Sequence, residues 1–310
     1  MSSPAWRCTA TGGPSMPWSL LAVAVILGGL AYALYKKMLL SQMIIIINFA
    51  VFFLMLAAAQ SFSMSASPLF PDLAFRPRYL TEGEQIYTLF TSLFVHADIW
   101  HILMNMFIFL LIGVPFEQRV GTPRFAAIYF LAGVGGTLTF SLFNWNSGVM
   151  LVGASGAIFG VFGAFAALYP RDQVVMPIPF PIMLFIRMPV LVAALLFAGL
   201  ETLYTVGQVS DGVAHLAHIG GLVSGVALAA ALRKIAPRTI SASAPSEGLA
   251  SLARTDAQRQ FLERVREADI PEVREAWMTR FLEEVECPRC GGPLISSRGI
   301  RCQRCGARFS

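Results

Sequence analysis

The chain has 310 residues, of which 56% are hydrophobic and only 13% are charged, and its mean hydropathy is +0.64. Soluble domains carry about 25% charged residues, so this composition excludes an ordinary soluble protein and predicts a polytopic membrane protein with a soluble tail. The formal charge of +5 does not predict nucleic-acid binding, because the basic residues lie in short loops and in the tail rather than in a stripe interleaved with aromatic residues.

The N-terminal segment, residues 1–15, is polar and predicts disorder. An apolar run from Trp18 to Tyr35 follows, and Lys36 and Lys37 come directly after it. Because the positive charges follow the run and no small-residue cleavage site is evident, we expect a transmembrane helix here rather than a signal peptide.

Six further apolar runs predict membrane helices, since each is close to the ~20 residues that cross the hydrocarbon core of a bilayer. These runs are residues 42–59, 99–115, 123–143, 150–169, 186–206 and 212–232. The stretch from Gln60 to Asp98 contains prolines and mixed charges, and we expect an interfacial loop there.

The basic residues predict the orientation of the helices in the membrane. If the helices alternate in direction, one side collects Lys36, Lys37, Arg119, Arg124, Arg171, Arg233, Lys234 and Arg238. Arg187 is expected on the same side, at the start of the helix 186–206. We take this side as cytoplasmic and expect a multi-pass protein of a bacterial inner (plasma) membrane with a cytoplasmic C-terminal tail. The turn near Asp211 then lies on the outer side.

The composition changes after residue 238. A linker rich in Ser, Ala and Pro covers 239–246, and two charged amphipathic helices are expected at 249–268 and 271–285, the second with Asp269 and Pro271 as start signals. We therefore divide the chain into an N-terminus with an additional helix (1–41), a membrane core (42–238), a linker with amphipathic helices (239–286) and a cysteine-bearing segment (287–310).

The cysteine segment carries two CxxC pairs separated by eleven residues: Cys287, Cys290, Cys302 and Cys305. Four thiolates at this spacing suit tetrahedral zinc, and a closed site of four cysteines is structural rather than catalytic. The alternatives are a redox pair or a knuckle that binds no metal. We expect a zinc-ribbon-like module that contacts a cytoplasmic protein partner.

Two residues with nucleophile and base chemistry lie at similar depths in the membrane core. Ser155 is eight residues past Ser147 on one expected helix, and His218 is seven residues past Asp211 on another. A hydroxyl and an imidazole at one level form a nucleophile–base pair if their helices touch. His215 is a rival base one turn earlier, but only His218 stands directly before paired glycines.

Glycines give these two helices a reason to touch. Gly156 and Gly160 on one helix, and Gly221 and Gly225 on the other, both have the GxxxG spacing that lets membrane helices approach closely. The alternative, that such glycines serve packing alone, is weakened by the serine and histidine beside them.

Serine attack also requires donors for an oxyanion. His101 and Asn105 have i, i+4 spacing near the outer end of the run 99–115, so both face one side of a helix. Their donors can hold the oxyanion together with the backbone N–H of Ser155; the alternatives are an interhelical hydrogen bond for Asn105 and an interfacial position for His101. Phe159, one turn after Ser155, packs either on the His218 ring or in the core. Glu201 lies in another expected helix and Asp211 at a loop, and no carboxylate in the helices suits a third triad member, so we predict a two-residue dyad.

Three blocks together resemble the rhomboid family of intramembrane serine proteases. They are residues 94–106 (FVHADIWHILMNM), 153–160 (GASGAIFG) and 217–221 (AHIGG) with Gly225. Gly113, Glu117 and Gly121 also resemble the family's loop after its second core helix. In two places the chain departs from the family's pattern. Tyr87-Thr88 stands where many relatives have Trp-Arg, and Phe159 stands where some have Tyr.

The resemblance implies an all-α fold with a six-helix core, to which the helix at 18–35 is additional. It implies a Ser155/His218 dyad with oxyanion donors at Asn105 and His101, no cofactor for catalysis, and cleavage of membrane-anchored protein substrates near the outer face of the lipid bilayer. The alternative function is a rhomboid-like pseudoenzyme that binds or escorts membrane proteins. A transporter is disfavoured, because the helices lack paired interruptions and charged linings.

Overall fold

A computed structural model of the chain describes residues 15–60, 64–180, 182–209, 212–233, 247–267, 271–296 and 300–309. The chain divides into two compact units, Met1–Ile235 and Ala236–Ser310, which are described separately. The expected disordered N-terminus, Asp211, the linker 239–246 and Asp269 lie outside the described residues.

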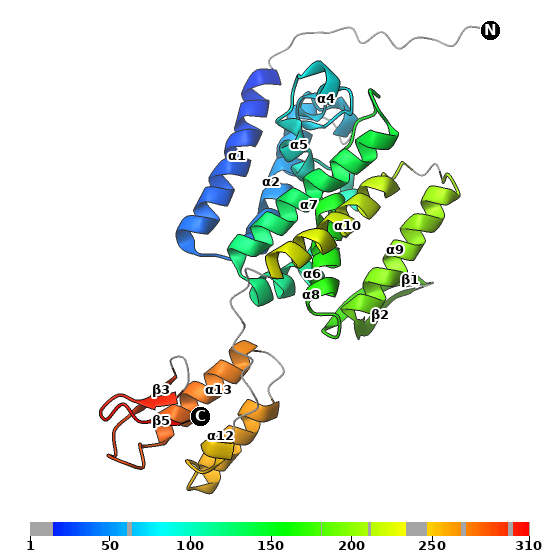
Figure 1. Cartoon of the computed structure of the whole chain (residues 1–310). Helices are drawn as coiled ribbons and strands as arrows, with labels where there is room; N and C mark the ends of the chain where they lie inside the picture. The colour runs from blue at the N-terminus through cyan, green and yellow to red at the C-terminus, as the bar shows by residue number, and fades with distance from the viewer. Residues whose placement is uncertain are drawn as a thin grey trace, which may run out of the picture. The chain divides into compact units, whose positions relative to one another are not determined.

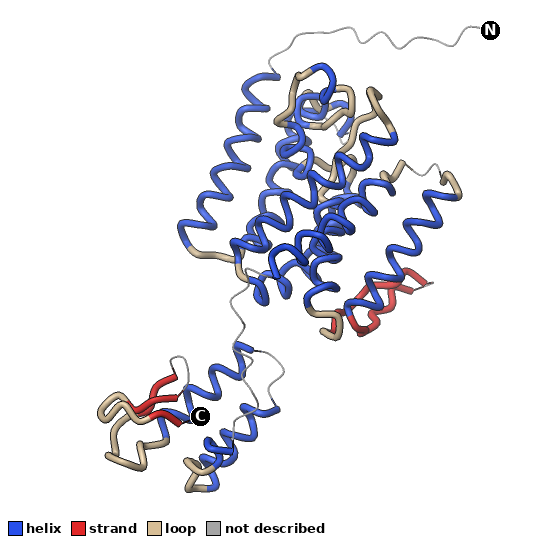
Figure 2. Tube along the Cα trace, in the orientation of Figure 1, coloured by secondary structure: helices blue, strands red, loops and turns tan. Residues whose placement is uncertain are grey.

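Seven apolar helices build the first unit (Figures 1 and 2): α1 (Ser15–Lys36), α2 (Leu40–Ala59), α6 (Ile99–Val120), α7 (Thr122–Phe143), α8 (Ser155–Leu168), α9 (Val190–Val206) and α10 (His215–Arg233). Five of them are long and apolar enough to cross a membrane, whereas α8 and α9 are shorter apolar helices of 14 and 17 residues. The predicted set of an additional helix and a six-helix core is confirmed.

The segment before α9 differs from the prediction. Residues expected to begin a helix at 186 instead complete an antiparallel hairpin of β1 (Gln173–Phe180) and β2 (Ile182–Pro189). Pro177 and Pro179 disfavour a helix, because proline lacks the N–H that a helix needs; at alternate positions their missing donors fall on one edge of the strand. Arg187 therefore lies exposed on β2 and not at a helix start.

The stretch between α2 and α6 contains short helices, where an interfacial loop was expected: η1 (Met64–Ala66), α3 (Leu69–Leu73), α4 (Tyr79–Glu82), α5 (Thr88–Thr91) and η2 (Ser92–Phe94). A backbone bridge between Phe75 and Leu151 ties the stretch to the loop before α8. The hydroxyl of Tyr87 donates to the Asp72 carbonyl at 2.9 Å, so Tyr87 anchors the stretch internally.

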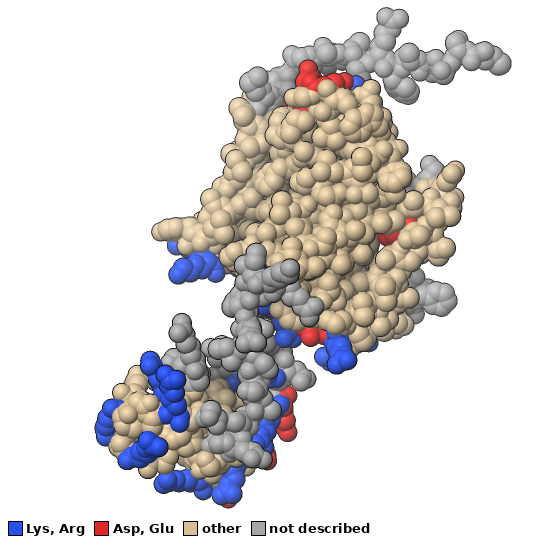
Figure 3. Space-filling view, viewed as in Figure 1, with Lys and Arg blue, Asp and Glu red and all other residues tan. Residues whose placement is uncertain are grey.

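Charged side chains lie at the two ends of this unit. On the face shown in Figure 3, Lys and Arg gather at one end, acidic groups gather mainly at the other, and the body between them is largely uncharged. At the basic end Arg119, at the end of α6, pairs with Asp172 after α8 at 3.1 Å. This contact shows that the end of α6 and the end of α8 lie on the same side of the unit.

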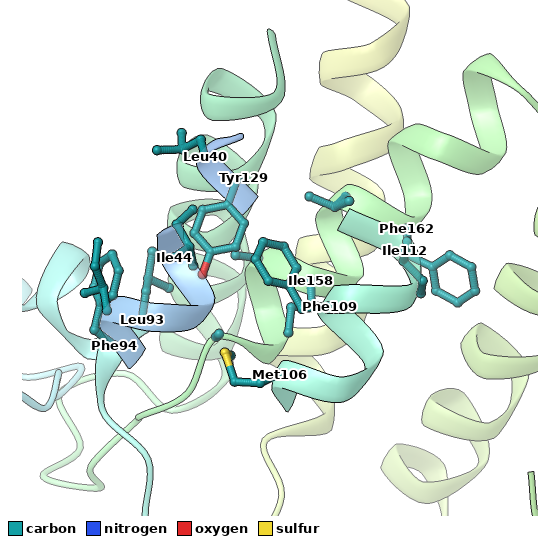
Figure 4. Packing of buried hydrophobic residues seen from close by; sticks show 14 of the residues in the cluster. Leu40, Ile44, Leu93, Phe94, Met106, Phe109, Ile112, Tyr129, Ile158 and Phe162 are labelled. Carbon is teal, nitrogen blue, oxygen red and sulfur yellow. The ribbon is translucent and has the colours of Figure 1, made fainter. Parts of the chain in front are cut away.

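The core between the helices is built largely from aromatic rings. Phe109 of α6 and Tyr129 of α7 are fully buried with ring centroids 5.2 Å apart (Figure 4). Phe116 packs on Phe165 of α8 at 5.2 Å. These rings connect α6, α7 and α8, and the Tyr129 hydroxyl among them is buried with no hydrogen-bond partner among the described residues.

Glu117 is buried and joins the end of α6 to the start of α2 and to the start of α7. Its carboxylate accepts hydrogen bonds from the backbone N–H groups of Leu40 (2.8 Å) and Ser41 (2.7 Å), and from the Thr122 hydroxyl (2.7 Å). The first N–H groups of a helix have no partner within the helix, and a negative charge is favourable there. Glu117 and Gly113 lie inside α6, not in a loop after it as expected; only Gly121 lies in the turn.

Glycines bring α8 and α10 into backbone contact. A Cβ added at Gly221 would collide with the carbonyl oxygen of Gly156, and one at Gly225 would collide with that of Gly160. The expected glycine interface is therefore present, and any larger residue on α10 at these two positions must push the helices apart.

The second unit consists of α11 (Glu247–Ala250), α12 (Asp256–Glu267), α13 (Pro271–Glu284) and a three-stranded sheet of β3 (Leu294–Ser296), β4 (Ile300–Cys302) and β5 (Arg308–Phe309), with β4 in the centre. The first expected amphipathic helix begins at Asp256 instead of 249. The apolar faces of the helices and the sheet share one small core that includes Leu262, Phe281 and Ile300.

We predict that Gly221→Ala destabilises the membrane unit by about 1–3 kcal/mol, since overpacked sites cost about this much. The measurement is thermal unfolding of the purified protein in detergent. Gly199→Ala on α9 is the matched control, because a Cβ there meets nothing within 4 Å. An equal or higher unfolding temperature for Gly221→Ala than for Gly199→Ala would contradict the interface.

Candidate active site

Ser155 and His218 meet across the α8–α10 interface. The Nε2 atom of His218 lies 2.7 Å from the Oγ of Ser155. Ser155 is the first residue of α8, and His218 is on the first turn of α10, three residues before Gly221. The structure thus brings the two residues within hydrogen-bond distance, as a nucleophile and its base require.

The imidazole of His218 is held on its flat side by Phe159. The two rings are stacked, with centroids 4.6 Å apart and planes 6° from parallel. His218 is only 7% exposed, so its ring has little freedom to rotate away from Ser155.

Gly153 allows His101 to approach the nucleophile. Its φ of +117° lies where residues with a side chain are strained, and a Cβ there would stand 2.7 Å from Nε2 of His101. The Nδ1 atom of His101 accepts from the Ala97 N–H at 3.4 Å. In a neutral ring the proton then lies on Nε2, the nitrogen that faces Gly153.

Asn105 shares a cavity with Ser155. This cavity has a volume of about 150 Å³, and the only polar residues among those lining it are Ser155 and Asn105; the others include Met104, Phe159 and Met176. One N–H of the Asn105 amide donates to the His101 carbonyl at 2.9 Å. An amide has two N–H donors, so the second can serve a ligand in the cavity.

The start of α8 adds backbone donors to the same place. Ser155, Gly156 and Ala157 are the first three residues of α8, and N–H groups at such positions have no partner within the helix. The helix dipole favours negative charge at this end. The arrangement can therefore stabilise an anion beside the Ser155 hydroxyl.

A carboxylate also reaches His218, contrary to the expectation that no helix carboxylate is placed as a third member. Glu201 of α9 is buried, with Oε1 3.0 Å from Nδ1 of His218 and Oε2 2.6 Å from Nδ1 of His215. His215 thus contacts Glu201, while His218 contacts Ser155. The signal in the sequence was a lone acidic residue within an apolar helix, which by default marks a functional site.

His96 lies in the loop between η2 and α6, in keeping with the interfacial loop expected at 60–98. It is fully buried, its ring lies 4.9 Å from that of His101, and neither ring nitrogen has a hydrogen-bond partner among the described residues. Burial keeps the pKa of His96 well below its usual range, so the ring is neutral and packs against His101.

The four cysteines of the second unit gather at one point, with their sulfur atoms all within 4.8 Å of one another. The Sγ atoms of Cys287 and Cys305 are 3.7 Å apart, and those of Cys290 and Cys302 are 3.4 Å apart. Zn–S bonds of about 2.3 Å in a tetrahedron give sulfur–sulfur distances of about 3.8 Å. The spacing of these residues fits a zinc ion.

Two backbone N–H groups favour the thiolate form of Cys302, whereas the contact with Cys302 raises the pKa of the Cys290 thiol to about 12. The N–H groups of Cys305 and Arg304 point at Sγ of Cys302 from 3.5 and 3.3 Å. These hydrogen bonds lower the pKa of the Cys302 thiol to about 6, and the thiolate is the form that binds metal.

Comparison with known proteins gives the family. Residues 83–235 match the model of the rhomboid domain. RHOMBOID-like protein 1 of Arabidopsis thaliana is 34% identical over 144 residues, which are 46% of this chain and 34% of that protein. Rhomboid-like protease 3 of Toxoplasma gondii is 39% identical over 84 residues, or 27% of this chain and 31% of that protein.

A third relative is named as inactive: Inactive RHOMBOID-like protein 8 of Arabidopsis thaliana is 32% identical over 93 residues, 30% of this chain and 26% of that protein. The chain spans less than half the length of each of these relatives. They come from a plant and an apicomplexan, so they lend no support to the expected bacterial membrane. The matched domain covers α6 to α10, the helices that carry Ser155 and His218, and it places this multi-pass membrane protein in the rhomboid family.

Proposed function

We propose that the chain is an intramembrane serine endopeptidase that cleaves membrane-anchored proteins near one face of the bilayer. The observation that carries the proposal is the 2.7 Å contact between Ser155 Oγ and His218 Nε2. Further support comes from the rhomboid domain of this chain and from its 39% identity over 84 residues to a relative that is named a rhomboid-like protease.

The reaction follows from this contact. Ser155 Oγ attacks the carbonyl carbon of the scissile peptide bond while its proton passes to Nε2 of His218. The carbonyl oxygen becomes an oxyanion, which Asn105, His101 and the first N–H groups of α8 stabilise. When the tetrahedral intermediate collapses, His218 returns the proton to the leaving amine, and an acyl-enzyme on Ser155 remains.

Water then completes the cycle. His218 takes a proton from a water molecule that attacks the ester, a second oxyanion forms at the same donors, and the acid product leaves as the proton returns to Ser155. Neither step requires a metal or an organic cofactor.

The membrane restricts the substrate. A peptide bond in an intact helix is hydrogen-bonded and shielded, and the cavity beside Ser155 holds about 150 Å³. We propose substrates whose transmembrane helix unwinds near its outer end, with Gly, Ala, Ser or Pro around the cleaved bond. The basic end of the unit, where Arg119 and Asp172 pair, is then the cytoplasmic side.

We also propose that Cys287, Cys290, Cys302 and Cys305 hold one structural zinc ion in the second unit, which then serves as a docking module for a protein on the cytoplasmic side. The support is the fit of the four sulfur atoms to a tetrahedral metal site. This site takes no part in peptide-bond cleavage.

The central test uses purified protein in liposomes with a single-pass model substrate. Ser155→Ala and His218→Ala are each expected to lower the cleavage rate at least ~10³-fold, as loss of a nucleophile or base does. Cleavage that persists in either variant would exclude the pair. Binding of the substrate by the wild-type protein without any cleavage would instead favour the pseudoenzyme.

The oxyanion assignment predicts a separate effect. Asn105→Ala should lower kcat by ~10²–10³-fold with KM little changed, the usual cost of one oxyanion donor. Met104→Leu is the control, because Met104 lines the same cavity but carries no N–H donor. An unchanged kcat in Asn105→Ala would remove Asn105 from the oxyanion site.

The zinc assignment is tested by metal analysis of the full chain. Wild-type protein should contain one zinc ion per chain, and Cys290→Ser should lose it, whereas Cys8→Ser, at the other end of the sequence, should keep it. If wild-type protein purified from cells grown with added zinc contains no zinc, the assignment is contradicted.

A further inference from the structure

We propose that Glu201 is a positioning residue for His218, so that the site works as a serine–histidine–glutamate relay spread over three helices. The inference rests on the proposed function and adds a residue that acts through the base. It is carried by two contacts of one buried carboxylate, at 3.0 Å to His218 and 2.6 Å to His215.

The protonation state that His218 needs as a base requires a hydrogen-bond acceptor beside its Nδ1 atom. A neutral imidazole carries one N–H. If Ser155 donates its hydroxyl proton to Nε2 of His218, the N–H must be on Nδ1, and that N–H points at Oε1 of Glu201. Glu201 thereby selects the tautomer that can act as a base.

The same contact stabilises the transition state. When Nε2 takes the serine proton, His218 becomes a cation, and the carboxylate 3.0 Å from Nδ1 compensates the new charge. Both groups are largely withheld from water, since the side chains of His218 and Glu201 are 9% and 11% exposed. Low exposure strengthens the interaction of the two groups.

His215 completes the arrangement by holding the other carboxylate oxygen. An unpaired carboxylate in an apolar helix is costly, and two imidazole N–H groups satisfy one oxygen each. Contacts at both oxygens also fix the plane of the carboxylate. Tyr204 of α9, with its ring 5.1 Å from that of His215, closes the other side of this histidine.

The contacts of Glu201 differ from those of Glu117, the other buried glutamate described in the membrane unit. Among the described residues, the partners of Glu117 are two backbone N–H groups and a threonine hydroxyl, so its contacts hold helices together. Glu201 accepts from the base itself, and its two contacts join α9 to His215 and His218 of α10.

The experiment compares Glu201→Gln, Glu201→Asp and Thr202→Val in the full chain, in liposomes with the same model substrate. Thr202 is the matched control, being next to Glu201 on α9 but exposed and bonded only to its own helix. We expect Glu201→Gln to lower kcat by at least ~10²-fold with KM within ~3-fold, because loss of the carboxylate in a triad costs up to ~10⁴-fold. Thr202→Val should match wild type.

Two further measurements separate positioning from folding. Glu201→Asp keeps the charge and should recover at least ~10-fold of the kcat lost in Glu201→Gln. Adding Glu201→Gln to His218→Ala should cause no further loss, because residues that act as a unit are not additive. If Glu201→Gln does not fold, Glu201→Asp decides: its kcat should fall below wild type at unchanged KM.

The outcomes are distinct. A wild-type protein with no Ser155-dependent cleavage would overturn the protease proposal itself. Three results would overturn the relay while leaving the Ser155–His218 pair intact. The first is a change in the cleavage rate of less than ~3-fold in Glu201→Gln, and the second is an effect of Glu201→Gln on KM alone. The third is that Glu201→Gln lowers kcat as much in the His218→Ala background as in wild type.

Discussion

Gly221 and Gly225 lie so close to the carbonyl oxygens of Gly156 and Gly160 that no side chain fits between them, and this backbone contact fixes the distance between α8 and α10. Ser155 precedes the first of these contacts on α8, and His218 precedes it on α10. Their 2.7 Å separation follows from a contact a few residues away. A shift of about 1 Å between the helices would take the two atoms beyond hydrogen-bond range. The chemistry therefore depends on the absence of side chains at the interface.

The two buried carboxylates described in the membrane unit, Glu117 and Glu201, each lie against hydrogen-bond donors. Glu117 accepts hydrogen bonds from the N–H groups at the start of α2, while Glu201 contacts the imidazoles of His215 and His218. In hydrocarbon neither carboxylate could stay charged without such partners. The same requirement explains why the polar site is compact: Ser155, Asn105 and the start of α8 share one small cavity, and the rest of its lining is apolar.

The sequence predicted the membrane helices because a span needs a long apolar run, and it predicted the Ser155–His218 pair because glycine spacing reveals which helix faces meet. It did not predict the β1–β2 hairpin. The segment before α9 is largely apolar, like the helices, and its alternating prolines, among them Pro177 and Pro179, are the sequence feature that favours a strand. Nor did it place Glu201 beside His218. They lie on consecutive helices, and no periodicity tells how two helices rotate toward each other.

The three members of the relay differ in how firmly they are held. Ser155 and His218 belong to helices joined by backbone contact, whereas Glu201 belongs to α9, where a Cβ at Gly199 would meet nothing within 4 Å and several leucines are exposed. In Figure 1, α9 stands at the side of the bundle next to the hairpin. A displacement of α9 alone would keep the nucleophile beside its base and withdraw the carboxylate that orients the base. The position of α9 would then set the strength of His218 as a base without dismantling the site.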